Sequence, residues 1–547
     1  MTFSLFDWLL LAVFLLSSIW LGLLGKRYVK GSDAYLVAGR SVGQYLGAIS
    51  LVSTEIGIIT YMYYAEMGAI YGFSAFLAGL VPAAVYLFLG ATGFVIKRFR
   101  EMELVTIPEY FERRYGRGVR VLGGILMAAG GVLNFGVFPV IEATFLNIVT
   151  GIPQEYLIWT MVFLMVSVLL YTALGGMVSV LITNYFQYIV LVLAMLAVTV
   201  WSLWGAGWTP AVESVSARLG EKGFNPFVHP DFGWSFLLWQ VLIWLAVLTC
   251  WAPVAMRAFA SESPEVGKRV FQWTGLIFLG RAVLPMFWGI LAIAYMKGAG
   301  GPAIEATPRM LSQVLPIGVK GLVVAGMLAA SMSTYSGYLL AWSSVISEDV
   351  IIPLRRRAIE PRTALLINRI TILFLTVFII VWGLFYVVPG ATYFYLQMTA
   401  NLFLAGTFWA LVGGLHWKYS NSAGAYLGLV LGGGATLLYF VSPNPSQSAG
   451  TIGVLSYVLA LAGMAGGSLA ASPLVSRAVR AAAGAGVAAL TAGCALWFLR
   501  GGLPGLAWLE GWTLVLVVSS IVFAGLSAHA IFAGYGELRK TLRRMSG

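Results

Sequence analysis

The sequence predicts an all-α polytopic membrane protein. Apolar side chains make up 60% of the 547 residues and charged ones only 10%, which is far from the balance of a water-soluble domain. Apolar runs of about 20 residues, long enough to cross a bilayer as helices, recur about 15 times along the chain. Because lipid cannot satisfy free backbone groups, each of these runs should fold as a helix.

The basic residues predict how these crossings are oriented. With the N-terminus placed outside, 25 of the 33 Lys and Arg residues, Arg257 among them, fall in cytoplasmic loops, as the positive-inside rule requires. The C-terminus should then lie inside, and a bacterial inner membrane is the expected location. The net charge of +12 reflects this topology and contact with anionic lipid, so we expect no nucleic-acid partner.

The first candidate site lies in the apolar run 317–346. Five of the six positions 331–336 carry hydroxyl groups, which lipid cannot hydrogen-bond. On a helix, the hydroxyls of Ser333 and Thr334 lie one turn beyond the carbonyl of Ala330, so three oxygens can converge. Converging neutral oxygens suit a small hard cation. The alternative is that the hydroxyls only bond back to carbonyls of their own helix.

Two other apolar runs should be interrupted near the middle of the membrane. In the run 45–68, Gly57 and several β-branched residues weaken the helix next to the carboxylate of Glu55. In the run 234–258, Pro253 removes a backbone donor and crowds the preceding turn. Unwound backbone would free carbonyls that a bound cation can satisfy. The alternative for the first run is a continuous helix in which Glu55 is a structural acid.

The interrupted runs lie five crossings apart and have opposite orientations. This arrangement is typical of a transporter built from two inverted five-helix repeats, with its site near the midplane. We therefore expect an extra span and a cytoplasmic loop over residues 1–44, the first repeat over 45–204 and the second over 234–415. Peripheral spans and a basic tail should occupy residues 416–547.

Polar side chains inside the apolar runs mark candidate contacts for a solute. Arg281 lies about as deep as Glu55, and it should either pair with an acid such as Glu55 or grip a solute carboxylate with its guanidinium fork. Gln240 and Gln397 are compatible with a carboxylate, a sugar or a nucleobase. Glu142 should lie about two turns below the outer surface, where it would line an outer vestibule or mark the interface.

These motifs together resemble the sodium/solute symporter family, whose members have the leucine-transporter type of fold. The resemblance covers roughly residues 30–440, and its last landmark is similar to the sodium/proline branch in particular. The landmarks are Asp33-Ala34-Tyr35-Leu36-Val37-Ala38-Gly39-Arg40, Tyr171-Thr172-Ala173-Leu174-Gly175-Gly176-Met177, Thr183-Asn184-Tyr185-Phe186-Gln187 and the stretch from Ser331 to Asp349. This chain departs from the family in having Asn184 where members often have Asp, and Glu55-Ile56-Gly57 where the proline branch has Asp followed by Met-Ser.

The resemblance implies a sodium site where the broken second crossing meets the hydroxyl stretch. Its ligands would be the carbonyls of Ser53, Ile56 and Ala330 and the hydroxyls of Ser333 and Thr334. Substrate would lie beside it, against both breaks, with the candidate contacts Thr54, Glu55, Gln240, Trp251, Arg281 and Gln397.

We therefore expect secondary active transport, in which inward sodium movement draws in a small polar organic solute, with an amino acid or carboxylate favoured. The alternatives are a sensor on a transporter scaffold, a proton-coupled symporter with Glu55 as the carrier, or a sugar or nucleobase substrate. No Walker motif and no H-E-x-x-H pattern occurs, so we expect neither an ATP-driven pump nor an enzyme. No obligate protein partner is evident.

Overall fold

The computed structural model describes residues 3–25, 32–297, 301–355, 360–388, 390–442, 444–474 and 476–499. Within these ranges the regular elements are helices, and a single isolated bridge pairs Val42 with Ser261. The all-α expectation is therefore confirmed. Eleven helical stretches of the described chain are long and apolar enough to cross a membrane.

This number is lower than the expected 15 crossings, and the difference has several sources. The stretch Ile58–Thr92 joins parts of two expected crossings through a short 3₁₀ turn. The expected crossing 156–174 contributes only the shorter apolar segment Gln154–Leu169, and the expected crossing 482–499 falls in α22 (Arg477–Leu499), which is not among the eleven. The expected crossing 511–533 lies outside the described residues. The total of 15, the orientation and the inverted repeat stay predictions.

The second crossing is broken, as the sequence predicts. Helix α3 (Gln44–Thr54) ends before Glu55, and α4 (Ile58–Tyr71) begins after Gly57, whose backbone is extended. The side chain of Thr60 satisfies two of the freed backbone groups, since its hydroxyl accepts from Gly57 N at 3.2 Å and donates to Glu55 O at 3.2 Å. The unwound segment is therefore held in place by the first turn of the helix that follows it.

The other predicted interruption is also present. Helix α12 (Gly233–Cys250) ends at Trp251, which has extended backbone angles, and α13 (Ala252–Ala260) begins directly after it. Pro253 lies in the first turn of α13, where its missing N–H leaves no helical hydrogen bond unmade.

Helix α16 (Val319–Ser344) is the central element of the fold, and almost all of its side chains are buried. It packs along α10 (Leu157–Ala206), which is kinked at Gly176. Next to it, α14 (Pro264–Tyr295) packs against α4 and α5 (Leu77–Thr92). The two broken crossings thus lie among long helices that keep their own hydrogen bonds.

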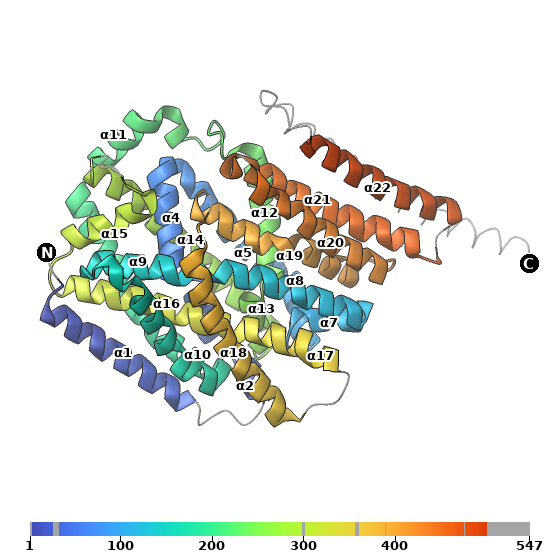
Figure 1. Cartoon of the computed structure of the whole chain (residues 1–547), viewed down its shortest axis with the longest axis horizontal. Helices are drawn as coiled ribbons and strands as arrows, with labels where there is room; N and C mark the ends of the chain where they lie inside the picture. Colours follow the sequence, from blue (N-terminus) through green and yellow to red (C-terminus); the bar gives the residue numbers. More distant parts are fainter. Residues whose placement is uncertain are drawn as a thin grey trace, which may run out of the picture.

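The remaining helices surround this centre (Figure 1). Helix α1 (Leu5–Gly25) lies along α10 on one side, while α20 (Ser422–Leu437), α21 (Pro445–Ala471) and α22 (Arg477–Leu499) lie on the other. The others are α2 (Ser32–Val37), α6 (Ile96–Glu101), α7 (Ile107–Tyr115), α8 (Arg117–Phe135), α9 (Phe138–Thr150), α11 (Trp208–Leu219), α15 (Ala303–Val314), α17 (Ile352–Arg355), α18 (Pro361–Phe385) and α19 (Thr392–His416).

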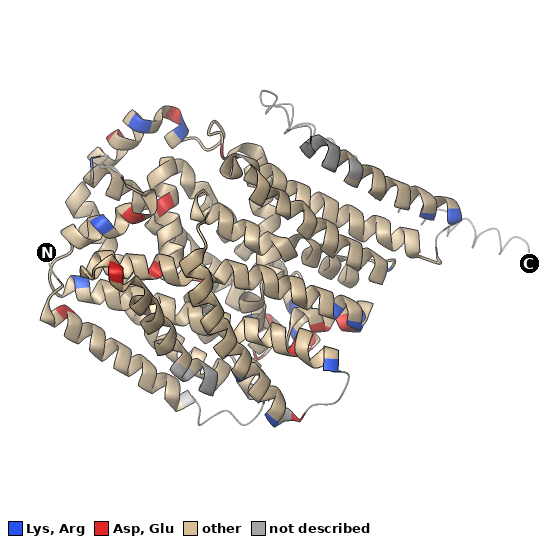
Figure 2. Ribbon diagram, in the orientation of Figure 1, with Lys and Arg blue, Asp and Glu red and all other residues tan. Residues whose placement is uncertain are grey.

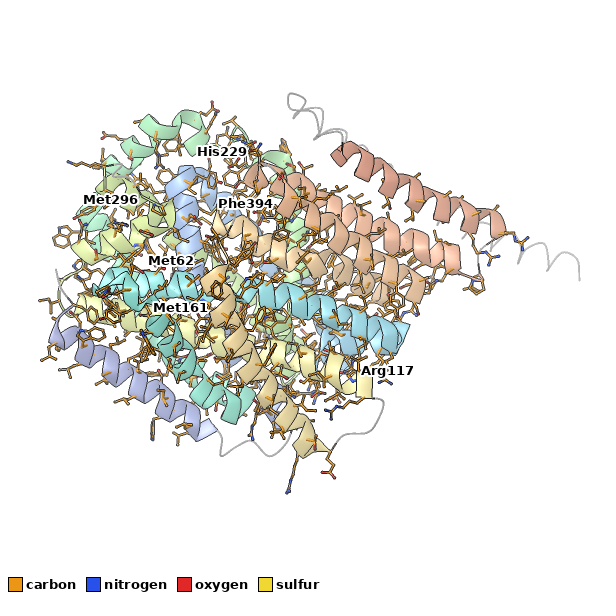
Figure 3. The ribbon with its side chains drawn as sticks, viewed as in Figure 1. Met62, Arg117, Met161, His229, Met296 and Phe394 are labelled. Carbon is orange, nitrogen blue, oxygen red and sulfur yellow. The ribbon has the colours of Figure 1, made fainter. Side chains whose placement is uncertain are left out.

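Charged residues gather toward the ends of the helices, and most of the ribbon between them carries none (Figure 2). Arg117, for example, lies at the edge of the molecule, whereas Met62 lies in its middle (Figure 3). The short helix α7 carries several charged residues, while its Pro108 and Phe111 side chains are buried. The few charged residues that are buried in the middle of the molecule are therefore candidates for a functional site.

Candidate functional site

Backbone and hydroxyl oxygens converge where the break between α3 and α4 meets α16. The hydroxyl oxygen of Ser333 lies 2.8 Å from Ser53 O and 2.9 Å from Ala330 O. Ser333 therefore faces the broken crossing and its own helix at the same time. Ser336 follows the alternative expectation, because its hydroxyl donates to a carbonyl of its own helix, Ser333 O, at 3.1 Å.

The other two predicted ligands lie at the same place. Ile56 is part of the break, with its N–H 3.4 Å from Ser53 O. The hydroxyl oxygen of Thr334 lies 3.1 Å from the position that a Cβ would take on Gly57, and it has no hydrogen-bond partner within the described residues. Neutral oxygens with spare lone pairs fit a small hard cation. All five predicted ligand residues thus lie at the break or next to it, and their role stays a prediction.

A cavity of about 70 Å³ adjoins these oxygens, and Thr334 forms part of its wall. Four of the six predicted solute contacts line it: Glu55, Trp251, Arg281 and Gln397. Tyrosines 63, 338 and 393 contribute aromatic wall from three different helices. An apolar and aromatic wall with a few convergent polar groups is typical of a site for a small molecule.

The other two predicted contacts lie outside the lining of this cavity. Gln240 stands behind the wall, where its side-chain oxygen accepts from Trp244 Nε1 at 3.2 Å and from Tyr393 Oη at 2.6 Å. Thr54 faces the opposite side of the break, toward Arg257 and Asn184. Gln240 can position two wall residues, and Thr54 belongs to a different cluster.

Arg281 does not pair with Glu55, contrary to one of the two expectations. No ion pair joins these residues within the described chain, although both line the cavity. The guanidinium lies over the ring of Phe278, with 4.1 Å from Cζ to the ring centroid. Its Nε and Nη1 atoms, and Glu55 Oε1, have no hydrogen-bond partner in the described structure. The cavity therefore presents a cation and an anion that do not neutralise each other.

Arg257 was wrongly assigned to a cytoplasmic loop by the charge pattern. It lies in α13 with 1% of its side chain exposed. Its Nη2 donates to Thr54 Oγ1 at 2.5 Å, and its Nη1 donates to Pro253 O at 2.8 Å. Asn184 Nδ2 approaches the same Thr54 hydroxyl at 3.3 Å. This cluster joins α3 to α13 next to the break. In the sequence, the apolar residues on both sides of Arg257 were a signal that this arginine is buried.

Glu142 lies neither in an outer vestibule nor at the interface. It is completely buried in α9, and its Oε1 accepts the N–H of Ile59, in the first turn of α4, at 3.0 Å. The carboxylate thus lies against the break from the side opposite to Arg257. Sequence position gave its approximate depth but not the direction in which it points.

Comparison with known proteins identifies a matching family. The model of the sodium:solute symporter family matches residues 35–432. A putative sodium-dependent multivitamin transporter of Drosophila melanogaster is 25% identical over 403 residues, which are 68% of this chain and 64% of that protein. Sodium/glucose cotransporter 4 of Danio rerio is 25% identical over 487 residues, 79% of this chain and 71% of that protein. The chain thus spans about two thirds of the length of these relatives.

The fold is shared with a solved transporter structure. A Na+-coupled sialic acid symporter in a substrate-bound outward-open state superposes with a TM-score of 0.71 at 18% identity, covering 84% of this chain and 97% of that one. The expected leucine-transporter type of architecture is thereby supported at the level of fold. None of the proteins named here is a proline transporter, so the narrower resemblance stays a prediction.

Proposed function

Because the chain belongs to the sodium:solute symporter family, whose coupling ion is sodium and whose members are transporters rather than enzymes, we propose that it carries a small polar organic solute across the membrane together with sodium. The solute and the ion would bind at the two breaks and be released on the other side by alternating access. The cell membrane of a bacterium is the proposed location.

The observation that supports this proposal most directly is the convergence of Ser53 O, Ala330 O and Ser333 Oγ at the unwound segment. Two of these groups are backbone carbonyls, one from α3 and one from α16, and the third is a side-chain hydroxyl of α16. An ion bound there would join α3 to α16 through its ligands. Sodium here is cargo, since it must bind on one side of the membrane and leave on the other.

The driving force of such coupling can be bounded. One elementary charge falling through 100 mV releases about 2.3 kcal/mol, which supports roughly 40-fold accumulation of the solute per coupled ion. For this energy to be used, sodium must favour the arrangement that binds solute. By linkage, solute must then tighten sodium binding by the same factor.

We propose a zwitterion such as an amino acid as the solute class. The cavity holds one guanidinium and one carboxylate that do not pair with each other, which complements a solute bearing both charges. A solute carboxylate would face Arg281, and an amino group would face Glu55. The names of the relatives, multivitamin and glucose transporters, favour a vitamin or a sugar as the alternative.

The ion site is tested by sodium titration of uptake in proteoliposomes. Ser333→Ala and Thr334→Ala should each raise the sodium concentration for half-maximal uptake by tenfold or more. Ser343→Ala is the matched control, because Ser343 is also a buried serine of α16 and bonds only to Leu340 O of its own helix. Equal sodium dependence in all three variants and the unaltered protein would contradict the proposed site.

The solute is identified by thermal stability of the purified protein against a panel of amino acids, sugars, vitamins and nucleobases, with and without sodium. A co-transported solute should stabilise more strongly when sodium is present. Stabilisation by neutral sugars alone would reject the zwitterion. Binding without flux in proteoliposomes would favour the sensor, and uptake driven by a pH gradient in sodium-free buffer would favour proton coupling.

A further inference from the structure

The buried carboxylate of Glu142 is not needed by the sodium site described above, yet it lies within a few ångströms of it. Its Oε1 is 3.0 Å from Ile59 N and 3.0 Å from the position that a Cβ would take on Gly57. The hydroxyl oxygen of Thr334 lies 3.1 Å from that same Cβ position. Glu142 and Thr334 thus approach the unwound backbone at one residue.

Two further hydroxyls complete the surroundings of this carboxylate. Ser331 and Tyr335, both on α16, lie beside the Glu142 carboxyl group. The side-chain oxygens of all four residues are buried, but Glu142 Oε2 and the hydroxyls of Ser331, Thr334 and Tyr335 form no hydrogen bond of good geometry within the described chain. Four side-chain oxygens are therefore gathered between α9, α16 and the break.

No basic side chain among the described residues neutralises this carboxylate. Within these residues no Lys, Arg or His forms an ion pair with Glu142. A buried carboxylate is strongly unfavourable, and the N–H of Ile59 and the neighbouring hydroxyls of Ser331 and Tyr335 bring no positive charge to balance it. Such a group is stabilised by a proton or by a bound cation, and a set made only of carboxylate and hydroxyl oxygens has the chemistry of a site for a hard metal ion.

We propose that Glu142, Ser331, Thr334 and Tyr335 bind a second sodium ion, next to the one held by Ser53, Ala330 and Ser333. This inference rests on the proposed transport function. Thr334 lies between the two groups of ligands and is shared by both. Because Glu142 also holds the first turn of α4 through Ile59, the second ion fixes the geometry of the break that supplies carbonyls to the first. Each ion therefore favours binding of the other.

The test is equilibrium binding of ²²Na⁺ to the purified full-length protein in detergent, which needs no knowledge of the solute. The unaltered protein should bind two ions, and Glu142→Gln should bind one, because the amide keeps an oxygen for Ile59 but loses the charge. Glu66→Gln is the matched control: Glu66 is another buried acid on a nearby helix, and its Oε2 accepts Thr392 N at 3.0 Å. This control should still bind two ions.

A second, milder variant protects the test against misfolding. Tyr335→Phe removes one hydroxyl without altering charge or ring packing, and it should weaken the second ion about tenfold while leaving the first unchanged. Melting temperatures in sodium-free choline buffer verify that each variant is folded.

The outcomes separate this inference from the proposed function. One ion bound by both the unaltered protein and Glu142→Gln overturns the second site and leaves the first intact. One sodium bound with release of one proton, lost in Glu142→Gln, shows that Glu142 carries a proton and also overturns the proposal. No sodium bound by the unaltered protein rejects the transport function itself.

Discussion

A very close contact between two helices predicts a large effect from one methyl group. Helices α4 and α14 cross through glycine on both sides: a Cβ on Gly68 would lie 1.8 Å from Met286 O, and a Cβ on Gly289 would lie 1.9 Å from Ala65 O. Both obstacles are backbone carbonyls, which cannot rotate away as a side chain can. In Gly68→Ala the two helices must therefore separate by about 1 Å or more, since ordinary packing tolerates little overlap.

The cost can be set against a control on α14, the other helix of this contact. Overpacking of a well-packed interior typically destabilises by about 1–3 kcal/mol, and a rigid backbone obstacle places Gly68→Ala at about 3 kcal/mol. Gly280, also in α14, has no atom within 4 Å of its would-be Cβ. Gly280→Ala should therefore gain the helix propensity of alanine, up to about 1 kcal/mol. The two alanine variants should differ by about 3–4 kcal/mol.

The assay is thermal unfolding of both variants in the same detergent, followed by intrinsic fluorescence and by sodium-dependent uptake in proteoliposomes. Gly68→Ala should melt well below the unaltered protein. It should also transport poorly, because a displaced α4 moves Tyr63 and other residues of the cavity wall away from α14. Gly280→Ala should melt at the same temperature or above. Equal melting of the two variants would refute the close crossing of α4 and α14.

Three further predictions concern single hydrogen bonds. Asp7 Oδ1 accepts from Gly318 N and Gly321 N, both at 2.8 Å, so Asp7→Ala should destabilise by about 1.5–3 kcal/mol and Asp7→Asn by less, as measured by thermal unfolding. Thr54→Val removes an acceptor of the buried Arg257 guanidinium and should destabilise the protein by about 1.5–3 kcal/mol. In an Arg257→Met background the same substitution should cost almost no stability. Additive losses of stability in this double-mutant cycle would contradict the hydrogen bond. Glu66→Ala should speed amide hydrogen exchange at residues 391–394 without affecting exchange in α3, because Glu66 Oε2 accepts the first N–H of α19; unchanged exchange would show that Glu66 does not anchor this helix.

Features that depend on local chemistry along the chain were predicted correctly. Gly57 and Pro253 interrupt their helices because glycine is a poor helix former and proline removes a donor, and neither effect requires knowledge of neighbouring helices. The approach of Ser333 to Ala330 follows from helical periodicity alone. That Ser333 also faces Ser53 came from the family resemblance, since periodicity does not say which helix lies opposite.

Features that depend on the direction of a side chain were missed. Arg281 and Glu55 lie at similar depth and line one cavity, but they do not pair, because depth along a crossing says nothing about the angle around its axis. Arg257 was counted with the loop charges because the positive-inside rule cannot recognise a buried cation that is stabilised by hydrogen-bond acceptors inside the protein. The expected position of Glu142 failed for the same reason, since its partner is the backbone of a distant helix.

The proposed ion site and the contact between α3 and α13 involve consecutive residues, and this has a mechanical consequence for the proposed transport. Ser53 O faces Ser333, and the next side chain, Thr54, accepts from Arg257 on α13. Any movement that draws the end of α3 away from α16 pulls Ser53 from the ion and changes the position of Thr54 relative to Arg257. In the proposed transport cycle, separation of α3 from α16 and loss of sodium affinity would therefore be one event, as coupling requires. A separate hinge between the two residues would allow sodium to leak without solute, and the continuous helix α3 provides none.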